Sequence, residues 1–436
     1  MNRLTNINAN RSRTQVPDTA TRPASQSRLR LQAGPRQLVS LLLSAVLSCS
    51  ACLARAEDGA DNTLKIGVSG SFSGGSSPMG ESMRNGIRIA TEEINAIGGI
   101  NGKKVALVEL DDQSNNELGK KIAQDLIRQK VVATIGIVNT GVGLASIDAY
   151  QQAKIPLLIA VSTGTILTHK YAPPAAPENY IFRISPTADL EVQALIADLN
   201  RRGLLKVAVL ADTTAYGDAG LKAFREQGKL GGLSITAEER FKLGDKDMNA
   251  QVLRARSSGA QAVVTWGIGP ELAVIARNKE ALAWRVPMLG SWTLSMGNFI
   301  ESAGKAGEGA LMPQTFVRDF GSSSKNGFLL AYQRFSKSNL IPSPMSAAQG
   351  YDGMHLLYLA LRQARSTDGT KIKEALENLT SRYQGVITNY DKPFSNADHD
   401  AITSNMLIMG KVVAGKIDYA YRDDEQRSGL VRKKNK

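Results

Sequence analysis

Three short stretches of the sequence place hydroxyl side chains beside glycines, a combination that suits anion binding. They are SGGSS (73–77), TG (140–141) and STGT (162–165). Glycine lets a ligand approach the backbone, and free N–H groups and hydroxyls at the start of a helix bind a carboxylate without a fixed cation. Each such helix end contributes about 0.3–1 kcal/mol. Thr140 and Ser162 could instead only cap their own helices, although capping is compatible with ligand binding.

The sequence lacks the motifs that nucleotide-binding proteins and α/β-hydrolases need. Gly141 and Gly143 begin a dinucleotide-binding fingerprint, but Ser146 takes the place of the third glycine, and 161–166 (VSTGTI) hold no acid for a ribose. The sequence has no Walker loop, and the serines of 69–77 do not form the Gly-x-Ser-x-Gly turn of α/β-hydrolases. We therefore expect no cofactor.

The three histidines, His169, His355 and His399, are isolated from one another in the sequence. His399 belongs to NADHD (396–400), which we interpret as a solvated turn rather than a metal site. Nothing in the sequence assembles a nucleophile, a base and an orienting group. We therefore expect neither a metal site nor an enzyme, and turnover assays with any tightly bound ligand would test this.

The hydroxyl-rich loops belong to a regular alternation of strands and helices. In the first block we expect strands at 64–70, 104–112, 131–138 and 155–162, and helices at 81–97, 118–130 and 143–153. After a Pro- and Asn-rich break with a strand at 180–185, strands recur at 206–212, 233–241, 261–267 and 286–292, with helices from 217, 248 and 270. Helices at 326–337, 345–364 and 371–379 and a β-rich end follow.

Two successive blocks of this kind predict an α/β protein with two similar lobes, each a parallel sheet with helices on both faces. The loops at the carboxyl ends of the strands then line the cleft between the lobes, where such sheets bind ligands. The hydroxyl-rich loops fall at these ends, so we expect them in the cleft.

The N-terminal region has the features of an export signal. Residues 1–56 contain eight arginines and one acidic residue, and the uncharged run 38–54 is short for a membrane span, which needs about 20 apolar residues. The ending Ala54-Arg55-Ala56 predicts cleavage before Glu57 and a periplasmic mature protein. An uncleaved N-terminal anchor is the alternative.

Charge and cysteine content narrow the class of partner. The formal net charge is +13, of which the leader carries +7 through eight arginines and one acid, so +6 remains on the rest of the chain. These charges form no basic stripe, and we expect no nucleic-acid partner. Both cysteines, Cys49 and Cys52, lie in the leader, so the mature chain must be stabilised by its core alone.

Four segments resemble the leucine/isoleucine/valine-binding periplasmic proteins, the solute receptors of ABC importers. They are 66–105, 131–163, AYGDAG (215–220) and GDKDMNAQV (244–252), and the resemblance extends from about Leu64 to Gly415. It implies the type I periplasmic binding fold, in which two Rossmann-like lobes joined by three strands close on a ligand. It also implies capture of a small carboxylate-bearing solute for an ABC permease, by a protein that we expect to be a monomer.

The resemblance also implies the extent of each part. The leader is 1–56, and the N-terminal lobe comprises 57–185 and 315–390. The C-terminal lobe comprises 186–314 and 391–425, and a basic tail occupies 426–436.

Part of the family's ligand site is intact in this chain. The resemblance implies that Thr140 grips the ligand's carboxylate through its hydroxyl and N–H. A second loop offers the Val161 carbonyl and the Thr163 hydroxyl and N–H, with Ser162 beside them. Tyr216, in the family's YG motif, closes over the ligand from the other lobe.

The other part of the site departs from the family. Trp292 falls where amino-acid binders place a glutamate that neutralises the ligand's ammonium, and Ile268 replaces a tyrosine. Met79 replaces an aromatic, so that wall is aliphatic, and Asn139 takes the place of a half-cystine of the family's small disulfide. Burying an ammonium without a counter-charge is costly. Trp292 is therefore either plain core or a flat apolar wall suited to an aromatic or short apolar acid.

Two ligand classes follow from these departures. The first is a branched-chain or other apolar amino acid, whose ammonium would be met by another acid such as Asp212, Glu239 or Glu271. The second is an acid without the ammonium, aromatic or 2-oxo. A sensor module that feeds a membrane receptor is the alternative to a transport receptor.

Overall fold

The computed structural model describes residues 62–319 and 321–428. The leader at 1–56 and the last residues of the basic tail, 429–436, lie outside the described residues. Within the described ranges, no helix combines the length and the apolar character needed to cross a membrane.

The first sheet has five parallel strands in the order β2-β1-β3-β4-β5. The strands are β1 (Thr63–Gly70), β2 (Lys104–Asp111), β3 (Ala133–Gly136), β4 (Leu157–Ile159) and β5 (Ile181–Arg183). They alternate with α2 (Ser77–Ala96), α3 (Asn116–Arg128), α4 (Thr140–Ala153) and the one-turn helix α5 (Ile166–His169). This is the βα alternation that the sequence predicts.

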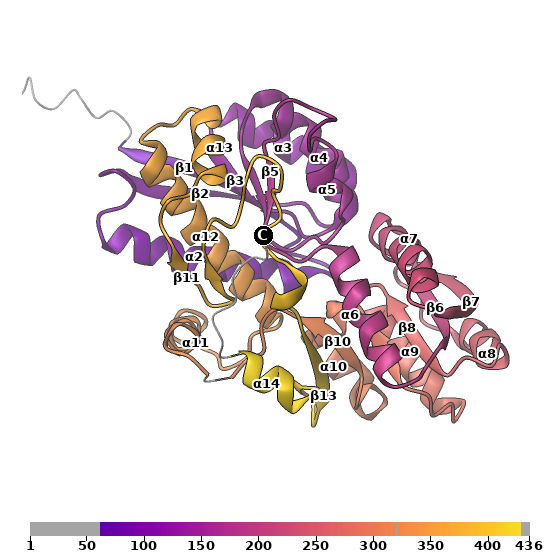
Figure 1. Ribbon diagram of the computed structural model, residues 1–436. Helices are drawn as coiled ribbons and strands as arrows, with labels where there is room; N and C mark the ends of the chain where they lie inside the picture. The colour runs from indigo at the N-terminus through magenta and orange to yellow at the C-terminus, as the bar shows by residue number, and fades with distance from the viewer. Residues whose placement is uncertain (1–61, 320, 429–436) are drawn as a thin grey trace, which may run out of the picture. The chain divides into compact units, whose positions relative to one another are not determined.

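Both faces of this sheet are covered by helices (Figure 1). Side chains of β1 point alternately to the two faces, so Ile66 packs with α2 on one face while Gly67 approaches Leu126 of α3 on the other. Three later helices return to the α2 side: α11 (Ser323–Ser336), α12 (Pro344–Ala364) and α13 (Gly369–Glu377). Helices α12 and α2 can pack closely because Gly86 has no side chain. A Cβ at this position would lie only 2.1 Å from the Ala347 carbonyl oxygen.

The second sheet has seven strands in the order β14-β13-β10-β9-β8-β6-β7. Its parallel part comprises β6 (Lys206–Asp212), β7 (Ser234–Phe241), β8 (Ala262–Trp266), β9 (Met288–Gly290) and β10 (Leu311–Gln314). The antiparallel edge comprises β13 (Ile408–Val413) and β14 (Lys416–Tyr419). The β-rich end predicted from the sequence thus completes this sheet.

Helices also cover both faces of the second sheet. They are α6 (Ala188–Arg201), α7 (Ala215–Leu230), α8 (Asn249–Ser257), α9 (Gly269–Ala281), α10 (Gly297–Ala303) and α14 (Arg422–Ser428). The remaining elements are the 3-10 turns η1 (Trp292–Ser295), η2 (Gly304–Gly307) and η3 (Ser404–Met406) and the small hairpin β11 (Tyr383–Gln384)–β12 (Asn389–Tyr390).

The α/β fold with parallel sheets flanked by helices is confirmed, but four helices, α5, α6, α10 and α14, are absent from the sequence-based assignment. Helix α6 begins directly after the Pro-rich break, where the Thr187 hydroxyl caps it by accepting from the Leu190 N–H at 3.2 Å. Helix α10 has only seven residues, too few to show a helical period. The chain passes from one sheet to the other at three points: after β5, after β10 and before β13. The exact boundaries of the two lobes stay a prediction.

Candidate functional site

Three loops at the carboxyl edge of the first sheet are joined by side-chain hydrogen bonds. Asn139, which precedes α4, accepts from the Ser71 hydroxyl at 2.7 Å and donates to the Ser76 hydroxyl at 3.0 Å. The hydroxyls of Thr140 and Ser162 lie 3.0 Å apart, and both side chains are buried. Asn139, which replaces a half-cystine of the family, thus links these loops through its side-chain amide.

Only one of the two threonines stands at a substantial helix tip. Thr140 is the first residue of α4, which has 14 residues. The sequence predicts that a second helix starts in the loop of Ser162 and Thr163, and this prediction is wrong, because α5 starts at Ile166 and has only four residues. The prolines Pro173 and Pro174 follow soon after, and proline cannot continue a helix. Thr163 therefore offers a ligand its own hydroxyl and N–H but no helix dipole.

The predicted apolar wall is assembled in one hydrophobic cluster. Met79, Val161, Ile268 and Trp292 are all less than a tenth exposed and belong to the same cluster of buried residues. Trp292 forms the start of η1 and Ile268 precedes α9, so the second sheet contributes two members and the first sheet the other two. Met79 and Trp292, 213 positions apart, thus belong to one buried cluster. Whether these residues form the wall of a ligand site stays a prediction.

Glu191 is the residue that the sequence analysis missed. It lies in the first turn of α6 and is fully buried. Its Oε2 accepts from the Trp292 N–H at 3.2 Å, while its Oε1 has no hydrogen-bond partner among the described residues. Burial raises the pKa of Glu191 to about 8, opposed by the Trp292 N–H and by the nearby Thr163 hydroxyl. The Thr163 contact influences the pKa but lacks the geometry of a full hydrogen bond.

Tyr216, in the first turn of α7, lies in the same region as Glu191. Its hydroxyl is buried and has no hydrogen-bond partner in the described part of the chain. Burial raises the pKa of Tyr216 well above its ordinary value, and the negative charge of Glu191 adds to the effect. Its ring packs against Trp266 with ring centroids 5.8 Å apart. Asp212 also raises the pKa of Tyr216, while the Ser291 and Thr293 side chains lower it.

Three buried polar atoms of these elements lack a hydrogen-bond partner among the described residues: Thr163 Oγ1, Glu191 Oε1 and the Tyr216 hydroxyl. Buried polar groups in folded proteins almost always have a partner, so each such atom needs an explanation. A bound solute with polar ends would satisfy all three.

The acids that the sequence offered as counter-charges have other partners. Glu239 forms a two-bond ion pair with Arg254, at 2.9 and 2.7 Å, so it is not available to a ligand. Asp212 accepts from the Thr214 N–H and hydroxyl at 2.8 and 2.6 Å, and thus organises the start of α7. Glu271 accepts from the Gly244 N–H at 2.7 Å. Asp212 and Glu271 each keep one buried oxygen without a hydrogen-bond partner among the described residues. The charge of Asp212 also raises the pKa of Tyr216.

The interpretation of His399 as a solvated, isolated residue is wrong. It is only 4% exposed, its ring stacks on Phe182 with centroids 3.9 Å apart, and its two nitrogens contact the Ile181 carbonyl at 2.9 Å and Glu377 at 3.2 Å. His169 and His355 also lie 3.2 Å from carboxylates. Residues 398–402 return to the edge of the first sheet, which buries this histidine. No group of three metal-binding side chains occurs among the described residues.

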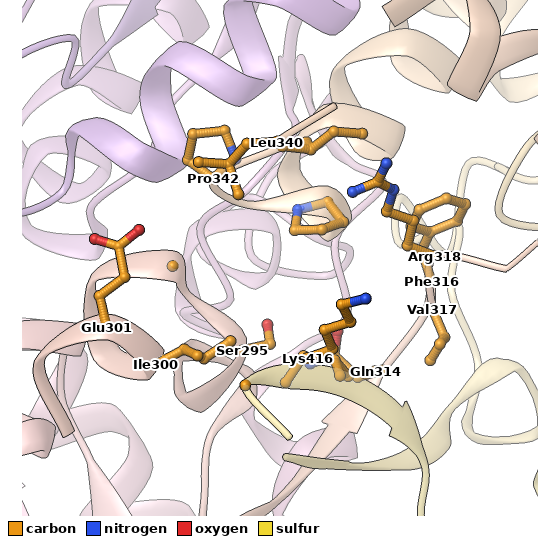
Figure 2. A pocket seen from close by; sticks show the side chains of 15 residues that line it. Ser295, Ile300, Glu301, Gln314, Phe316, Val317, Arg318, Leu340, Pro342 and Lys416 are labelled. Carbon is orange, nitrogen blue, oxygen red and sulfur yellow. The ribbon is translucent and has the colours of Figure 1, made fainter. Parts of the chain in front are cut away.

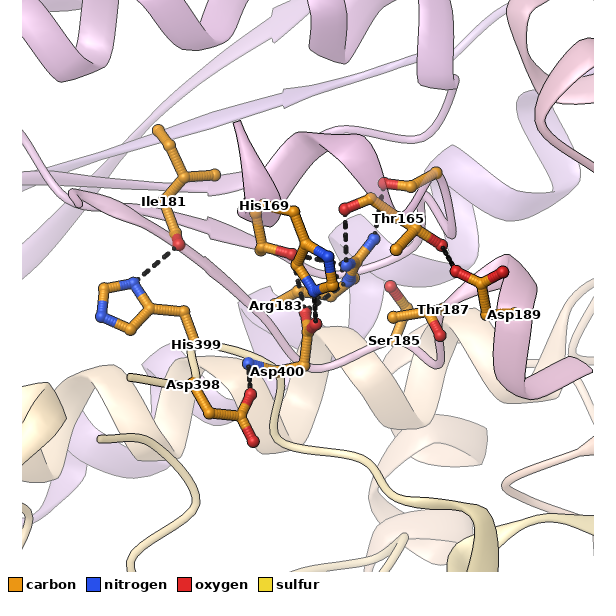
Figure 3. Close-up of polar contacts among 12 residues, drawn as sticks. Thr165, His169, Ile181, Arg183, Ser185, Thr187, Asp189, Asp398, His399 and Asp400 are labelled. Atoms are coloured by element: carbon orange, nitrogen blue, oxygen red, sulfur yellow. Dashed lines mark hydrogen bonds and ion pairs between the residues drawn. The ribbon is translucent and has the colours of Figure 1, made fainter. Parts of the chain in front are cut away.

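A buried ion pair fixes the loop that carries Thr163 (Figure 3). Arg183 is fully buried, and it donates to Asp400 at 2.8 Å, to the Gly164 carbonyl at 2.7 Å and to the Thr168 hydroxyl at 2.5 Å. Burial alone would raise the pKa of Asp400, but the Arg183 charge outweighs it and holds that pKa well below its usual range. On the other side of the loop, the Thr163 carbonyl accepts from the Ala188 N–H at 2.7 Å, which ties it to α6.

Comparison with known proteins places this arrangement in a family. The family model described as periplasmic binding protein matches residues 63–416. The chain belongs to the periplasmic binding protein family. Both parallel sheets and the loops that carry Thr140, Thr163, Tyr216 and Trp292 fall within the matched residues.

Three similar periplasmic binding proteins illustrate the relationship. The Leu/Ile/Val-binding protein homolog 3 of Brucella melitensis is 27% identical over 70% of this chain and 80% of its own length. A type 1 periplasmic binding protein structure from Bordetella pertussis is 27% identical, with a TM-score of 0.75 over 82% of this chain and 99% of that one. The branched-chain amino acid binding protein LivJ of Streptococcus pneumoniae, in complex with isoleucine, is 26% identical, with a TM-score of 0.71 over 82% and 98%.

Proposed function

We propose that this protein captures a small apolar amino acid in the periplasm and delivers it to the membrane subunits of an ABC importer. Glu191 carries the proposal, because it is a buried acid with a free oxygen beside Thr163 and Trp292. The ammonium of the solute would contact Glu191. Its carboxylate would contact Thr140, Ser162 and Thr163, as the family resemblance implies.

The apolar side chain of the solute would pack on Met79, Ile268 and Trp292, with the Val161 carbonyl and the Tyr216 hydroxyl completing the site. The relatives support this class, since their names describe binding of leucine, isoleucine and valine. Binding would favour the closed arrangement of the lobes because contacts from both lobes are made only there. No catalytic step is part of this proposal.

A second candidate is an acid without an ammonium group, aromatic or 2-oxo. Glu191 would then stay protonated, which its pKa of about 8 permits at neutral pH, and would donate a hydrogen bond to the ligand. A role as a sensor for a membrane receptor uses the same site and differs only in the partner.

A thermal-shift screen of purified protein, stripped of endogenous solute, separates the candidates. A ligand at about 100 times its dissociation constant stabilises the folded state by about 2.7 kcal/mol. We expect leucine, isoleucine or valine to raise the melting temperature more than their 2-oxo counterparts or benzoate. A response to the 2-oxo or aromatic acids alone would favour the second candidate, and no response to any of them would refute both.

Proton release on binding is a second expected result. At pH 7 the Glu191 carboxyl is mostly protonated, and an arriving ammonium lowers its pKa, so it ionises. Calorimetry at pH 7 in buffers of different ionisation enthalpy should show release of close to one proton per bound amino acid. Release should vanish above about pH 9, where Glu191 is already ionised. An equal enthalpy in all buffers at pH 7 would contradict ionisation of Glu191.

The same pKa has a consequence for the stability of the unliganded protein. The folded-state pKa of Glu191, about 8, lies above the unfolded value of about 4.3. The contribution of Glu191 to folding therefore becomes unfavourable as the pH rises from about 4 to 8. Denaturation with and without Glu191→Gln should show a difference that grows over this range.

Trp292→Ala tests the apolar wall. Removing a buried tryptophan costs about 3–5 kcal/mol of folding stability, so the variant must first be shown to be folded. We expect it to weaken an aromatic acid far more than leucine, because the flat indole matches a ring better than a branched chain. Calorimetric titrations with equal losses for both ligands would remove Trp292 from the site.

A further inference from the structure

A cavity of about 280 Å³ lies apart from the proposed solute site, next to η1 (Figure 2). Its walls come from residues 295–301, from 314–318, from the turn 415–417 and from the loop 340–344 that precedes α12. The backbone of Gly297 donates to the Pro342 carbonyl at 2.9 Å at one end of it. None of the predicted site residues lines this cavity.

The interior of the cavity is apolar. Phe316 and Ile341 are 2% and 5% exposed, and Ile300 and Ile417 complete the lining on the side of the second sheet. Pockets that bind small molecules combine such an apolar lining with a few placed polar groups. The lining alone would accept the hydrocarbon part of an organic molecule.

Two side chains at the base connect the cavity with the solute site. The Ser295 hydroxyl donates to the Trp292 carbonyl at 2.7 Å, and the Gln314 amide nitrogen contacts the same carbonyl at 3.4 Å. The peptide of Trp292 therefore separates the two sites, with its indole among the apolar wall residues and its carbonyl toward Ser295 and Gln314.

The mouth of the cavity carries two cations. Arg318 and Lys416 line it and are exposed to solvent, and neither takes part in an ion pair with any residue that the structure describes. Glu301, the acid of the lining, projects on the opposite side from Arg318 (Figure 2). Arginine and lysine attract carboxylates, and arginine can bind one through two hydrogen bonds.

We propose that this cavity is a second binding site, for a small organic anion with an apolar body and one carboxylate. The carboxylate lies at Arg318 and Lys416, and the apolar body lies against Phe316 and Ile341. The proposal does not depend on the identity of the solute at the first site. Ser295 and Gln314 of the cavity both contact the Trp292 carbonyl, so any coupling between the two sites runs through this peptide and is equal in both directions.

Octanoate is a suitable probe, with octanol as its uncharged counterpart. Titration calorimetry on a Thr163→Val variant isolates the cavity from the solute site. We expect saturable octanoate binding there, and about tenfold weaker binding when Arg318→Glu and Lys416→Glu are added, with octanol unaffected. A matched control makes the same change in net charge at two exposed lysines that do not line the cavity, Lys229→Glu and Lys242→Glu, and should leave octanoate affinity unchanged.

Three results would overturn the proposal: no saturable octanoate binding, equal loss in the control and the cavity variants, or equal loss of octanol and octanoate. If octanoate binds the unmodified protein but not Thr163→Val, it occupies the solute site, and the second site is refuted while the proposed function stands.

Discussion

Glu191→Gln is expected to weaken binding of an apolar amino acid by about two to three orders of magnitude. The ammonium of such a ligand would be buried beside Trp292 without a counter-charge, and removing one partner of a buried charge pair costs about 2–5 kcal/mol. The same substitution should leave a 2-oxo acid bound as before or bind it more tightly, because no charge pair is lost. Calorimetry with leucine and with its 2-oxo counterpart measures both effects on one protein preparation.

Glu239→Gln is the matched control for this experiment. Glu239 is a glutamate of the same lobe, but its carboxylate pairs with Arg254. Leucine affinity should be unchanged in this variant. If Glu191→Gln weakened both ligands equally, Glu191 would be acting on the shape of the site rather than on the ammonium.

Arg183→Met is expected to destabilise the folded protein by about 3–5 kcal/mol, the largest stability effect that we anticipate. The substitution leaves buried Asp400 with only His169 as a basic partner, and it removes the donor to Gly164 and Thr168. Denaturant titration at neutral pH measures this loss. The depressed pKa of Asp400 means that the ion pair contributes fully above about pH 4 and is lost as the pH falls through the folded-state pKa. The difference between the two proteins should therefore shrink in acid.

Arg254→Met provides the comparison for Arg183→Met. Its side chain is 60% exposed and pairs with Glu239, and exposed ion pairs are worth about 0–1 kcal/mol. A second variant, Arg183→Met with Asp400→Leu, removes both charges and should recover part of the lost stability. Equal stability losses for Arg183→Met and Arg254→Met would show that burial of the first pair has no energetic consequence.

Much of the fold could be predicted because its signals are local. Runs such as 206–212 are β-branched and apolar, and the helices between them have a clear period, so both parallel sheets were expected. The hydroxyl-rich loops could be placed as well, since parallel strands bring their carboxyl ends to one edge. Thr140 and Ser162 do meet there. Whether they hold a carboxylate stays a prediction.

Glu191 and His399 could not be placed from the sequence because their environments are non-local. Helix α6 follows directly on a proline-rich break, and only Thr187 with the acids of the first turn signals its start. The burial of Glu191 depends on Trp292, about a hundred residues later. His399 sits in a polar pentapeptide that a solvated turn would also suit, and it is buried only because that segment pairs with β5. The acid that we propose as the counter-charge thus lies in a segment whose local sequence pattern carries little information.

The anchoring of Gly164 by Arg183 has a practical consequence for converting this protein into a biosensor with a new target. Mutations at 164–168 would remove hydrogen-bond partners of the fully buried Arg183 guanidinium. Libraries that vary this loop should therefore yield mostly misfolded clones. Met79, Ile268 and Trp292 contribute apolar area without fixed partners for their side chains, and Glu191 contributes a single charge. Diversity for a new analyte is therefore best placed at these four positions, with the threonine loop left as it is.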